Sequence, residues 1–223
     1  MLTSTFIDYS DNVSGKTRAL FDLNKNVQNH QMLAKYRGFS SEILAVPEQI
    51  HSNEITCINK SGEYLATDGL ITDNPEIILT LKVADCVPIY LYESSSNIIG
   101  LVHSGWRGTT GGIVANAINK MLEMGAKEKK IHVFLGPAIG FCCYEVDAEV
   151  ADNFDKKSKR KLENGKWRVG LHEQIYLQLT KMDIPSTNIK TSDICTFESP
   201  NYHSFRRDGS QAGHMFAFLG MKL

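Results

Sequence analysis

The chain has 223 residues, of which 42% are hydrophobic and 22% are charged. This is the composition of an ordinary globular protein, and a chain of this length can bury a core without disulfides or a structural metal. A formal net charge of −1 provides no electrostatic basis for binding nucleic acid or a membrane surface. The length and the absence of an evident linker predict a single domain over residues 1–223.

Residues 1–12 have no apolar core behind a basic start, so we expect no secretory signal peptide. No run approaches the roughly 18 consecutive apolar residues of a membrane-spanning helix. The five cysteines are odd in number and irregularly spaced, which argues against a disulfide framework. We therefore expect a reduced, cytoplasmic protein with no nucleic-acid or membrane partner. The sequence leaves its oligomeric state open.

Apolar runs and helical periodicity divide the chain into elements. The expected strands lie at 5–9, 43–46, 47–51, 55–58, 68–72, 79–92, 98–102, 131–135, 194–197 and 215–219. The expected helices lie at 26–36, at 113–122 with Gly125 as C-cap, from 147 and from 171, and the basic cluster 156–161 is expected on a solvated helix face. Because strands outnumber helices and do not alternate with them, the pattern favours layered α+β architecture over a doubly wound α/β fold.

The most informative stretch is 80–108, where a Ser/Asn turn separates two apolar runs. The polar pair Asp85-Cys86 interrupts the first run, and Pro88 favours an edge strand, a bulge or an irregular strand end there. The second run leads directly into His103. A thiol and an imidazole are therefore expected at or near the ends of neighbouring strands, where functional sites are commonly built.

His51, Cys86 and His103 are candidate metal ligands at strand ends. A catalytic zinc site uses three protein ligands, often His and Cys, and leaves a fourth position for water. Zinc lowers the pKa of that water toward about 7. Asp85 is placed to orient a ligand or to accept a proton. The spacing matches no compact metal motif, so the alternative that Cys86 and the histidines are structural core residues stays open.

Two further chemistries use the same residues. Cys86 as a thiolate with His103 as its base would form a nucleophilic dyad without metal. Two histidines and one cysteine can also bind copper. The chain has seven histidines but no His-x-His pair, which makes a multicopper oxidase the weakest of the three interpretations.

Two glycine-rich loops are candidate substrate-binding segments. Gly105–Gly112 precedes a helix, where free N–H groups suit phosphate, and Arg107 adds a bidentate cationic donor. The structural alternative is a tight turn with Trp106 packed in the core. Gly136 begins a second such loop, 136–140, which precedes Cys142 and Cys143. Near the C-terminus, Arg206 and Arg207 are either anion binders or partners of Asp208 in a loop ion pair.

Five motifs together resemble the YfiH-like, laccase-domain (polyphenol oxidase) family. In chain order they are Q-I-H-S, A-D-C-V-P, H-S-G-W-R-G-T, G-P-A-I-G-F-C-C-Y-E-V and F-R-R-D-G-S-Q-A-G-H-M. They cover about residues 48–220, whereas the first 45 residues match poorly. The chain departs from the family pattern at Phe141, where Pro is usual, and at His214, where Arg is usual.

The resemblance implies a YfiH-like layered α+β fold, with mixed β-sheets packed between helices. It implies zinc, rather than copper, bound by His51, Cys86 and His103. It also implies phosphorolysis of adenosine, inosine, guanosine and methylthioadenosine, together with deamination of adenosine to inosine. The partners are then purine nucleosides and phosphate.

The site roles that follow are expectations on these matched motifs. The catalytic residues are Asp85, Cys86 and His103, with Asp85 handling protons. The substrate-binding residues are Arg107 (for phosphate), Gly136, Cys142 and Arg206. A non-enzymatic alternative is a partner-binding or cell-wall quality-control protein whose metal is structural and has four protein ligands.

Overall fold

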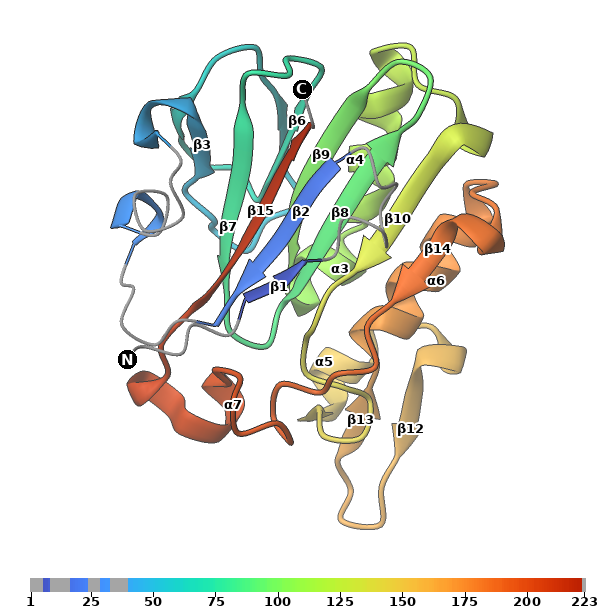
Figure 1. The fold of residues 1–223 in the computed structure, drawn as a ribbon. Coiled ribbons are helices and arrows are strands. Elements are labelled where there is room, and N and C mark those ends of the chain that lie inside the picture. Colours follow the sequence, from blue (N-terminus) through green and yellow to red (C-terminus); the bar gives the residue numbers. More distant parts are fainter. Residues whose placement is uncertain (1–5, 9–16, 24–28, 33–39, 222–223) are drawn as a thin grey trace.

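The computed structural model describes residues 6–8, 17–23, 29–32 and 40–221. Three β-sheets and a set of short helices make up the fold (Figure 1). The first sheet has the order β1-β2-β15-β7-β3-β5, the second has the order β14-β10-β8-β9-β6-β4, and a small third sheet has the order β11-β13-β12. Both six-stranded sheets mix parallel and antiparallel pairs, which confirms the α+β prediction.

The strands of the first sheet are β1 (Phe6–Asp8), β2 (Thr17–Asp22), β3 (Leu44–Pro47), β5 (Gly62–Tyr64), β7 (Ile78–Val83) and β15 (Met215–Met221). Those of the second are β4 (Ile55–Cys57), β6 (Gly69–Thr72), β8 (Val87–Glu93), β9 (Ile98–Ser104), β10 (Ile131–Leu135) and β14 (Ile189–Thr191). The third sheet contains β11 (Glu145–Val146), β12 (Lys159–Lys161) and β13 (Trp167–Val169). The helices are α3 (Trp106–Thr110), α4 (Ile113–Glu123), α5 (Ala148–Ala151), α6 (Leu171–Lys181) and α7 (Phe205–Asp208).

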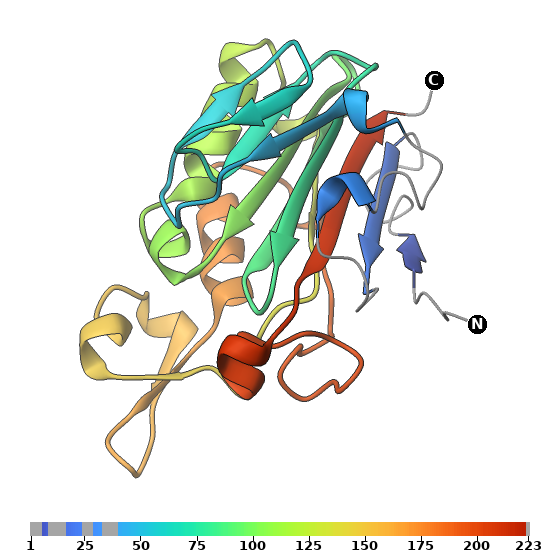
Figure 2. The same cartoon turned by 90° about the vertical axis from the view of Figure 1, so that its left-hand side faces the viewer.

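Two apolar cores separate the layers. Leu79 and Leu81 of the first sheet meet Tyr90 and Tyr92 of the second in one core. On the other face of the second sheet, the alternate residues of β8 pack with α4 and α6. The second sheet is thus buried on both faces, which explains why β8 and β9 are continuous apolar runs. The layers run sheet, sheet, helices (Figure 2).

The chain passes from the first sheet to the second three times in residues 44–93. It does so between β3 and β4, between β5 and β6, and between β7 and β8. Every crossing contains a non-glycine residue with a positive φ angle: His51 (60°) in the first, Ala66 (51°) in the second and Asp85 (80°) in the third. Left-handed backbone is costly for such residues, so the surrounding structure must hold these bends in place. The crossings bring distant parts of the sequence to one edge of the sheet pair.

These crossings correct two sequence predictions. The expected strand 47–51 is instead a loop beyond Pro47, because Gln49 and His51 both have positive φ. The apolar run 79–92 is two strands in different sheets, since the backbone turns at Asp85.

Pro88 lies in a central strand, so the edge-strand interpretation is wrong. It stands second in β8, beyond the last residue paired with β10, which agrees with an irregular strand end.

Four more expectations differ from the structure. The segment after Gly105 forms the short helix α3 where a turn was expected, and the loop 202–209 contains α7. The expected strand 194–197 is a turn that makes one isolated bridge, Cys195 to Ala138. The basic cluster 156–161 forms a 3-10 turn and β12, because β12 pairs with β13.

Most of the expected helix 26–36 lies outside the described residues. The remaining helix and strand predictions agree with observed elements, apart from small shifts of their ends. Gly125 has a φ angle of 97°, as expected for a C-cap glycine after α4. No helix in the described part of the chain has the length and apolarity needed to cross a membrane.

Candidate metal centre and cavity

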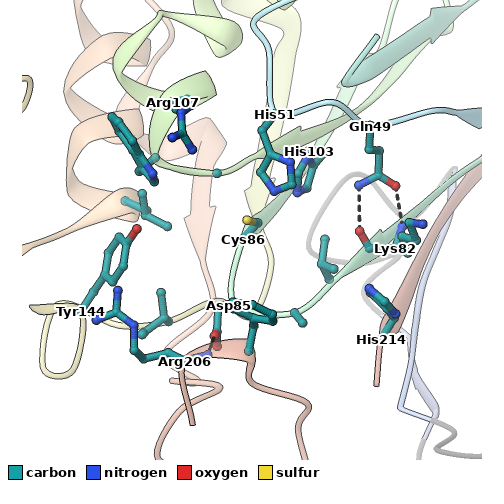
Figure 3. Close-up of a pocket in the computed structure, with 17 residues that line it drawn as sticks. Gln49, His51, Lys82, Asp85, Cys86, His103, Arg107, Tyr144, Arg206 and His214 are labelled. Carbon is teal, nitrogen blue, oxygen red and sulfur yellow. Dashed lines mark hydrogen bonds between the residues drawn. The ribbon is translucent and has the colours of Figure 1, made fainter. Parts of the chain in front are cut away.

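His51, Cys86 and His103 come together as the sequence predicted. One ligand atom from each lies within 4.8 Å of the other two. The two imidazole rings meet edge to face with their centroids 4.8 Å apart. His51 and Cys86 come from two of the sheet crossings, and His103 comes from the end of β9 (Figure 3). The group can hold a metal with two imidazoles and one thiolate.

Asp68 organises this centre from behind, and sequence reasoning missed it. Its side chain is fully buried, and Oδ1 lies 2.8 Å from Nδ1 of His103. The same carboxylate accepts bonds from the backbone N–H groups of Ile50, His51 and Ser52 and from the Ser52 hydroxyl. A carboxylate is acceptor-only when ionised, so Nδ1 of His103 donates to it and Nε2 is left for a metal. Asp68 thus fixes one ligand ring and the backbone of the other.

Gly105 leaves the space that the centre needs. A Cβ atom at this position would lie 3.0 Å from Sγ of Cys86 and 3.1 Å from the His51 ring. Any side chain here would therefore press on two of the three candidate ligands. The glycine in the H-S-G-W-R-G motif is explained by this close approach rather than by a turn, because its backbone is extended.

The titration of the centre suits metal binding. Burial alone would raise the pKa of Cys86, but the adjacent His103 and His51 lower it to about 6. Burial would lower the pKa of His103, but Cys86 and Asp68 raise it to about 9. For Asp68, burial is outweighed by hydrogen bonds from His103 and Ser52, which lower its pKa to about 2. The thiolate, the ligand form of cysteine, is therefore accessible at neutral pH.

A cavity of about 450 Å³ opens beside the three residues. Three aromatic side chains line it, namely Trp106, Tyr144 and Phe205. Its charged lining consists of Lys82, Arg107 and Arg206 against one carboxylate, Asp85. The lining thus combines flat apolar surfaces with an excess of positive charge (Figure 3).

Asp85 lines the cavity, but its carboxylate is engaged by the chain itself. Oδ1 accepts from the Thr196 hydroxyl at 2.6 Å, and Oδ2 accepts from the Ser204 hydroxyl and the Arg206 backbone N–H at 3.0 and 2.7 Å. These bonds tie the third sheet crossing to the start of α7. The contacts support a positioning role for Asp85 next to Cys86 better than a role in proton transfer.

The two adjacent arginines have different surroundings. Arg207 forms the ion pair with Asp208 at 2.8 Å and donates to backbone carbonyls of the preceding loop, including that of Tyr202. Arg206 instead reaches the cavity, lies over the Tyr144 ring at 5.0 Å and donates to the Glu145 carbonyl. The loop ion pair expected from the sequence is thus formed by Arg207, while Arg206 lies at the cavity.

Two of the expected substrate-binding residues are not among those that line the cavity. Gly136 is buried, and its carbonyl accepts from His172 at 2.9 Å. Cys142 lies in a separate group with Cys143, Cys195 and Glu198. Arg107 and Arg206 do line the cavity, as does His214, one of the two departures from the family pattern.

A family model described as multi-copper polyphenol oxidoreductase laccase matches residues 12–222. The chain belongs to this family. The match begins at residue 12 and so extends beyond the stretch 48–220 that carries the five motifs. The chain is 35% identical over 215 residues to "Purine nucleoside phosphorylase YlmD" of Geobacillus stearothermophilus, covering 88% of this chain and 78% of that protein. It is 34% identical to "Purine nucleoside phosphorylase CA_C1699" of Clostridium acetobutylicum, covering 89% and 86%.

Solved structures have the same fold. The hypothetical protein YfiH of Bacillus licheniformis superimposes with a TM-score of 0.85 at 28% identity, covering 93% of this chain and 94% of that one. YlmD of Geobacillus stearothermophilus gives a TM-score of 0.84 at 30% identity, covering 93% of each chain. The YfiH-like fold expected from the motifs is confirmed.

Proposed function

We propose that this protein is a zinc-dependent purine nucleoside phosphorylase that also deaminates adenosine. The observation that carries the proposal is the opening of a cavity with aromatic and cationic walls directly beside His51, Cys86 and His103. Relatives at 35% and 34% identity bear the name purine nucleoside phosphorylase, which supports an enzyme of this kind.

The donor set and its surroundings fit zinc. Two imidazoles and one thiolate provide three ligands, as in catalytic zinc sites that keep one position open. The carboxylate of Asp68 behind His103 is the partner that zinc-bound histidines usually have. A bound zinc would supply Lewis-acid activation of water at neutral pH.

Copper oxidase chemistry is less well supported. In the described part of the chain, no candidate metal group contains more than two histidines. A dioxygen-reducing copper cluster requires many closely spaced imidazoles, so the family description alone does not carry that activity to this chain.

The aromatic walls provide a binding surface for a purine. Trp106 and Tyr144 present flat side chains to the cavity, and stacking of a base on an aromatic ring contributes about 1–3 kcal/mol. Burial is the main cause that raises the pKa of Tyr144 to about 12, so its hydroxyl is protonated at neutral pH and can donate a hydrogen bond. Phe205, 62% exposed, extends the apolar wall to the rim.

Arg107 is the best-placed phosphate ligand. Its guanidinium stacks on Trp106 at 4.4 Å and, among the described residues, makes no side-chain hydrogen bond or ion pair. Its donors are therefore available for the bidentate recognition of a phosphate. Arg206 provides a second charge, although its side chain also donates to the Glu145 carbonyl. Phosphate binding at Arg107 and base binding at the aromatic rings would position both substrates in one cavity.

Phosphorolysis then follows from this placement. A phosphate oxygen bonds to C1′ of the ribose as the bond from C1′ to the purine nitrogen breaks, and the purine leaves with the electron pair and takes up a proton. The arginines orient the phosphate and the aromatic residues hold the base, so that the two substrates meet in a reactive geometry. The second reaction, deamination of adenosine, replaces the amino group of the adenine ring with oxygen from water and releases ammonia. Adenosine, inosine, guanosine and methylthioadenosine share a purine ring system on a ribose-type sugar, which this surface can bind.

The test is to incubate the purified, zinc-loaded protein with adenosine, with and without phosphate, and to separate the products by chromatography. We expect adenine and ribose 1-phosphate only when phosphate is present, and inosine in both cases, with hypoxanthine from its phosphorolysis when phosphate is present. His51→Gln should abolish both activities. His132→Gln, which changes a half-buried histidine on β10 outside the cavity, serves as the matched control.

Adenine formed without phosphate would indicate a hydrolase and contradict the phosphorylase assignment. Activity retained in His51→Gln would separate the reaction from the metal centre.

A further inference from the structure

A second group of soft ligands lies outside the cavity. Cys142, Cys143, Cys195 and Glu198 each offer an atom within 4.8 Å of the others, and no disulfide joins the three thiols. None of the four lines the cavity that contains His51, Cys86 and His103. The three thiols come from segments more than 50 residues apart in sequence, and their convergence with Glu198 forms a set of four soft and hard donors in one place.

Two tight turns build this group. Cys142 and Cys143 lie on one turn, closed by a bond from the Cys143 N–H to the Gly140 carbonyl at 3.0 Å. Cys195 and Glu198 lie on the other, closed by a bond from the Ser199 N–H to the Cys195 carbonyl at 3.0 Å. The second turn gives the C-x-x-E spacing that matches the short ligand spacing of structural zinc sites.

The two turns are held against each other by the backbone. Ala138 and Cys195 form an isolated parallel bridge, and the Thr196 N–H donates to the Ala138 carbonyl at 3.0 Å. The loops that follow β10 and β14 thus run side by side below the sheets (Figure 1). This scaffold places the four ligand atoms within 4.8 Å of one another.

Gly140 gives the sulfur atoms room and a donor. Its N–H donates to Sγ of Cys195 at 3.2 Å, a bond that favours the thiolate. A Cβ atom at Gly140 would lie 3.0 Å from Sγ of Cys142 and 3.4 Å from Sγ of Cys195. Cys195 is buried while Cys142 and Glu198 are exposed, so a cation can reach the group from solvent.

We propose that Cys142, Cys143, Cys195 and Glu198 bind a second, structural divalent cation of the zinc class. Three thiolates and one carboxylate complete a four-coordinate set, so this site is closed and its metal would not react with substrate. Its position gives it a mechanical role. Thr196 follows Cys195 in the chain and donates to Asp85, which precedes Cys86. The cation would therefore fix the turn that holds Asp85, a residue of the cavity lining, in place.

Cobalt binding distinguishes the two groups, because the thiolate-to-cobalt absorption grows with the number of sulfur ligands. Protein stripped of metal under reducing conditions is titrated with Co²⁺ and then with Zn²⁺, and zinc content is measured by mass spectrometry. Two double variants are compared. One combines His51→Gln with His103→Gln and removes metal binding by the first group. The other combines Cys143→Ser with Glu198→Gln and removes metal binding by the second. Cys57→Ser, at an exposed cysteine of β4, is the control.

We expect two zinc ions per chain in the unchanged protein and in the control, and one in each double variant. The cobalt absorption of the His51 and His103 variant should be about three times that of the Cys143 and Glu198 variant, because its site has three thiolates rather than one. If the His51 and His103 variant binds no metal, or if the Cys143 and Glu198 variant still binds two, the proposal is overturned.

A single substitution at the exposed Glu198 is a milder test, because it is less disruptive to the fold than the double variants. Glu198→Gln alone should keep the fold by circular dichroism and weaken zinc binding at this site by about 10-fold or more. Unchanged zinc affinity in that variant would remove Glu198 from the ligand set and contradict the closed four-coordinate site.

Discussion

The two ligand groups of this protein differ in the way that separates catalytic from structural metal sites. The first has three ligands from distant segments, two imidazoles among them, and a cavity of about 450 Å³ beside it. The second has four ligands, three of them thiols, on two adjoining turns outside that cavity. The first is assembled where the chain crosses between sheets, which leaves one side open to substrate. The second is assembled by turns that surround it. An open site can perform chemistry, and a closed one can only stabilise.

The largest expected effect on activity comes from replacing one cysteine in each ligand group and comparing the two variants. Cys86→Ser should remove the metal from the first group and lower phosphorolysis by about 10³-fold or more, because a Lewis acid contributes several kcal/mol to the transition state. Cys195→Ser should leave more activity, since none of the four residues of its group lines the cavity and they act on it through their neighbours, such as Thr196, which donates to Asp85. Steady-state kinetics with metal analysis on both variants gives the measurement. Equal losses of activity would contradict the distinction between an open and a closed site.

A second prediction concerns the carboxylate behind the first group. Asp68→Asn keeps the shape of the side chain but removes the charge that orients His103, so zinc affinity should fall about 10- to 100-fold. Isothermal titration with zinc measures this change. The exposed Asp73 provides the control, because Asp73→Asn should alter nothing. Zinc affinity unchanged in Asp68→Asn would remove Asp68 from the centre.

Arg107 tests whether the cavity binds phosphate separately from the base. Arg107→Ala should raise the KM for phosphate by about 10-fold or more, the loss of a charge-assisted hydrogen-bonded contact of about 1.5–3 kcal/mol. Deamination of adenosine, which uses no phosphate, should change little. The comparison needs both rates from one preparation. An equal fall in both would show that Arg107 acts on the base or on the fold.

The residues of the first ligand group and the arginines of the cavity could be predicted from the sequence. The contacts formed where the chain passes from one sheet to the other could not. The ligand trio and the cationic residues Arg107 and Arg206 follow from motifs, because their residue types carry recognisable chemistry. The pattern of the run 79–92 predicts one strand, because the polar pair Asp85-Cys86 that interrupts it is equally compatible with a bulge or an irregular strand end, whereas in the structure the backbone turns there into the second sheet. Asp68 was missed because its partners are backbone N–H groups 16 to 18 residues away in sequence.

The second group shows the same limit. Cys142 was expected in the substrate site because it follows a glycine-rich loop, yet its neighbours in space are Cys195 and Glu198. The segment 194–197 was expected to be a strand, and a strand would have pointed Cys195 and Thr196 to opposite faces without bringing Glu198 back toward them. The turn at this place depends on the bridge to Ala138, a contact between segments over 50 residues apart.

The smallest expected effect concerns the loop that leads from β10 to the second group. Among the described residues, the Gly136 carbonyl is the one hydrogen-bond partner of the His172 side chain, and burial lowers the pKa of His172 to about 4. Its folded pKa lies below its unfolded value of about 6.5, so the unfolded chain binds more protons between these values and stability falls as pH drops from about 6.5 toward 4.

His172→Gln should lessen this loss by roughly 1–3 kcal/mol near pH 4, because glutamine does not titrate. Urea unfolding at pH 7.5 and pH 4.5, on both proteins without metal, gives the comparison. The same pH dependence in both would show that His172 is not buried in its neutral form.

The central claim is that the open group, and not the closed one, drives the chemistry. The direct measurement is a zinc titration of the metal-free Cys143→Ser, Glu198→Gln variant, in which only the first group remains, with phosphorolysis of inosine followed at each addition. We predict that activity rises with added zinc and reaches its plateau at one equivalent. Zinc bound at one equivalent without any phosphorolysis, or full activity before zinc is added, would contradict the account.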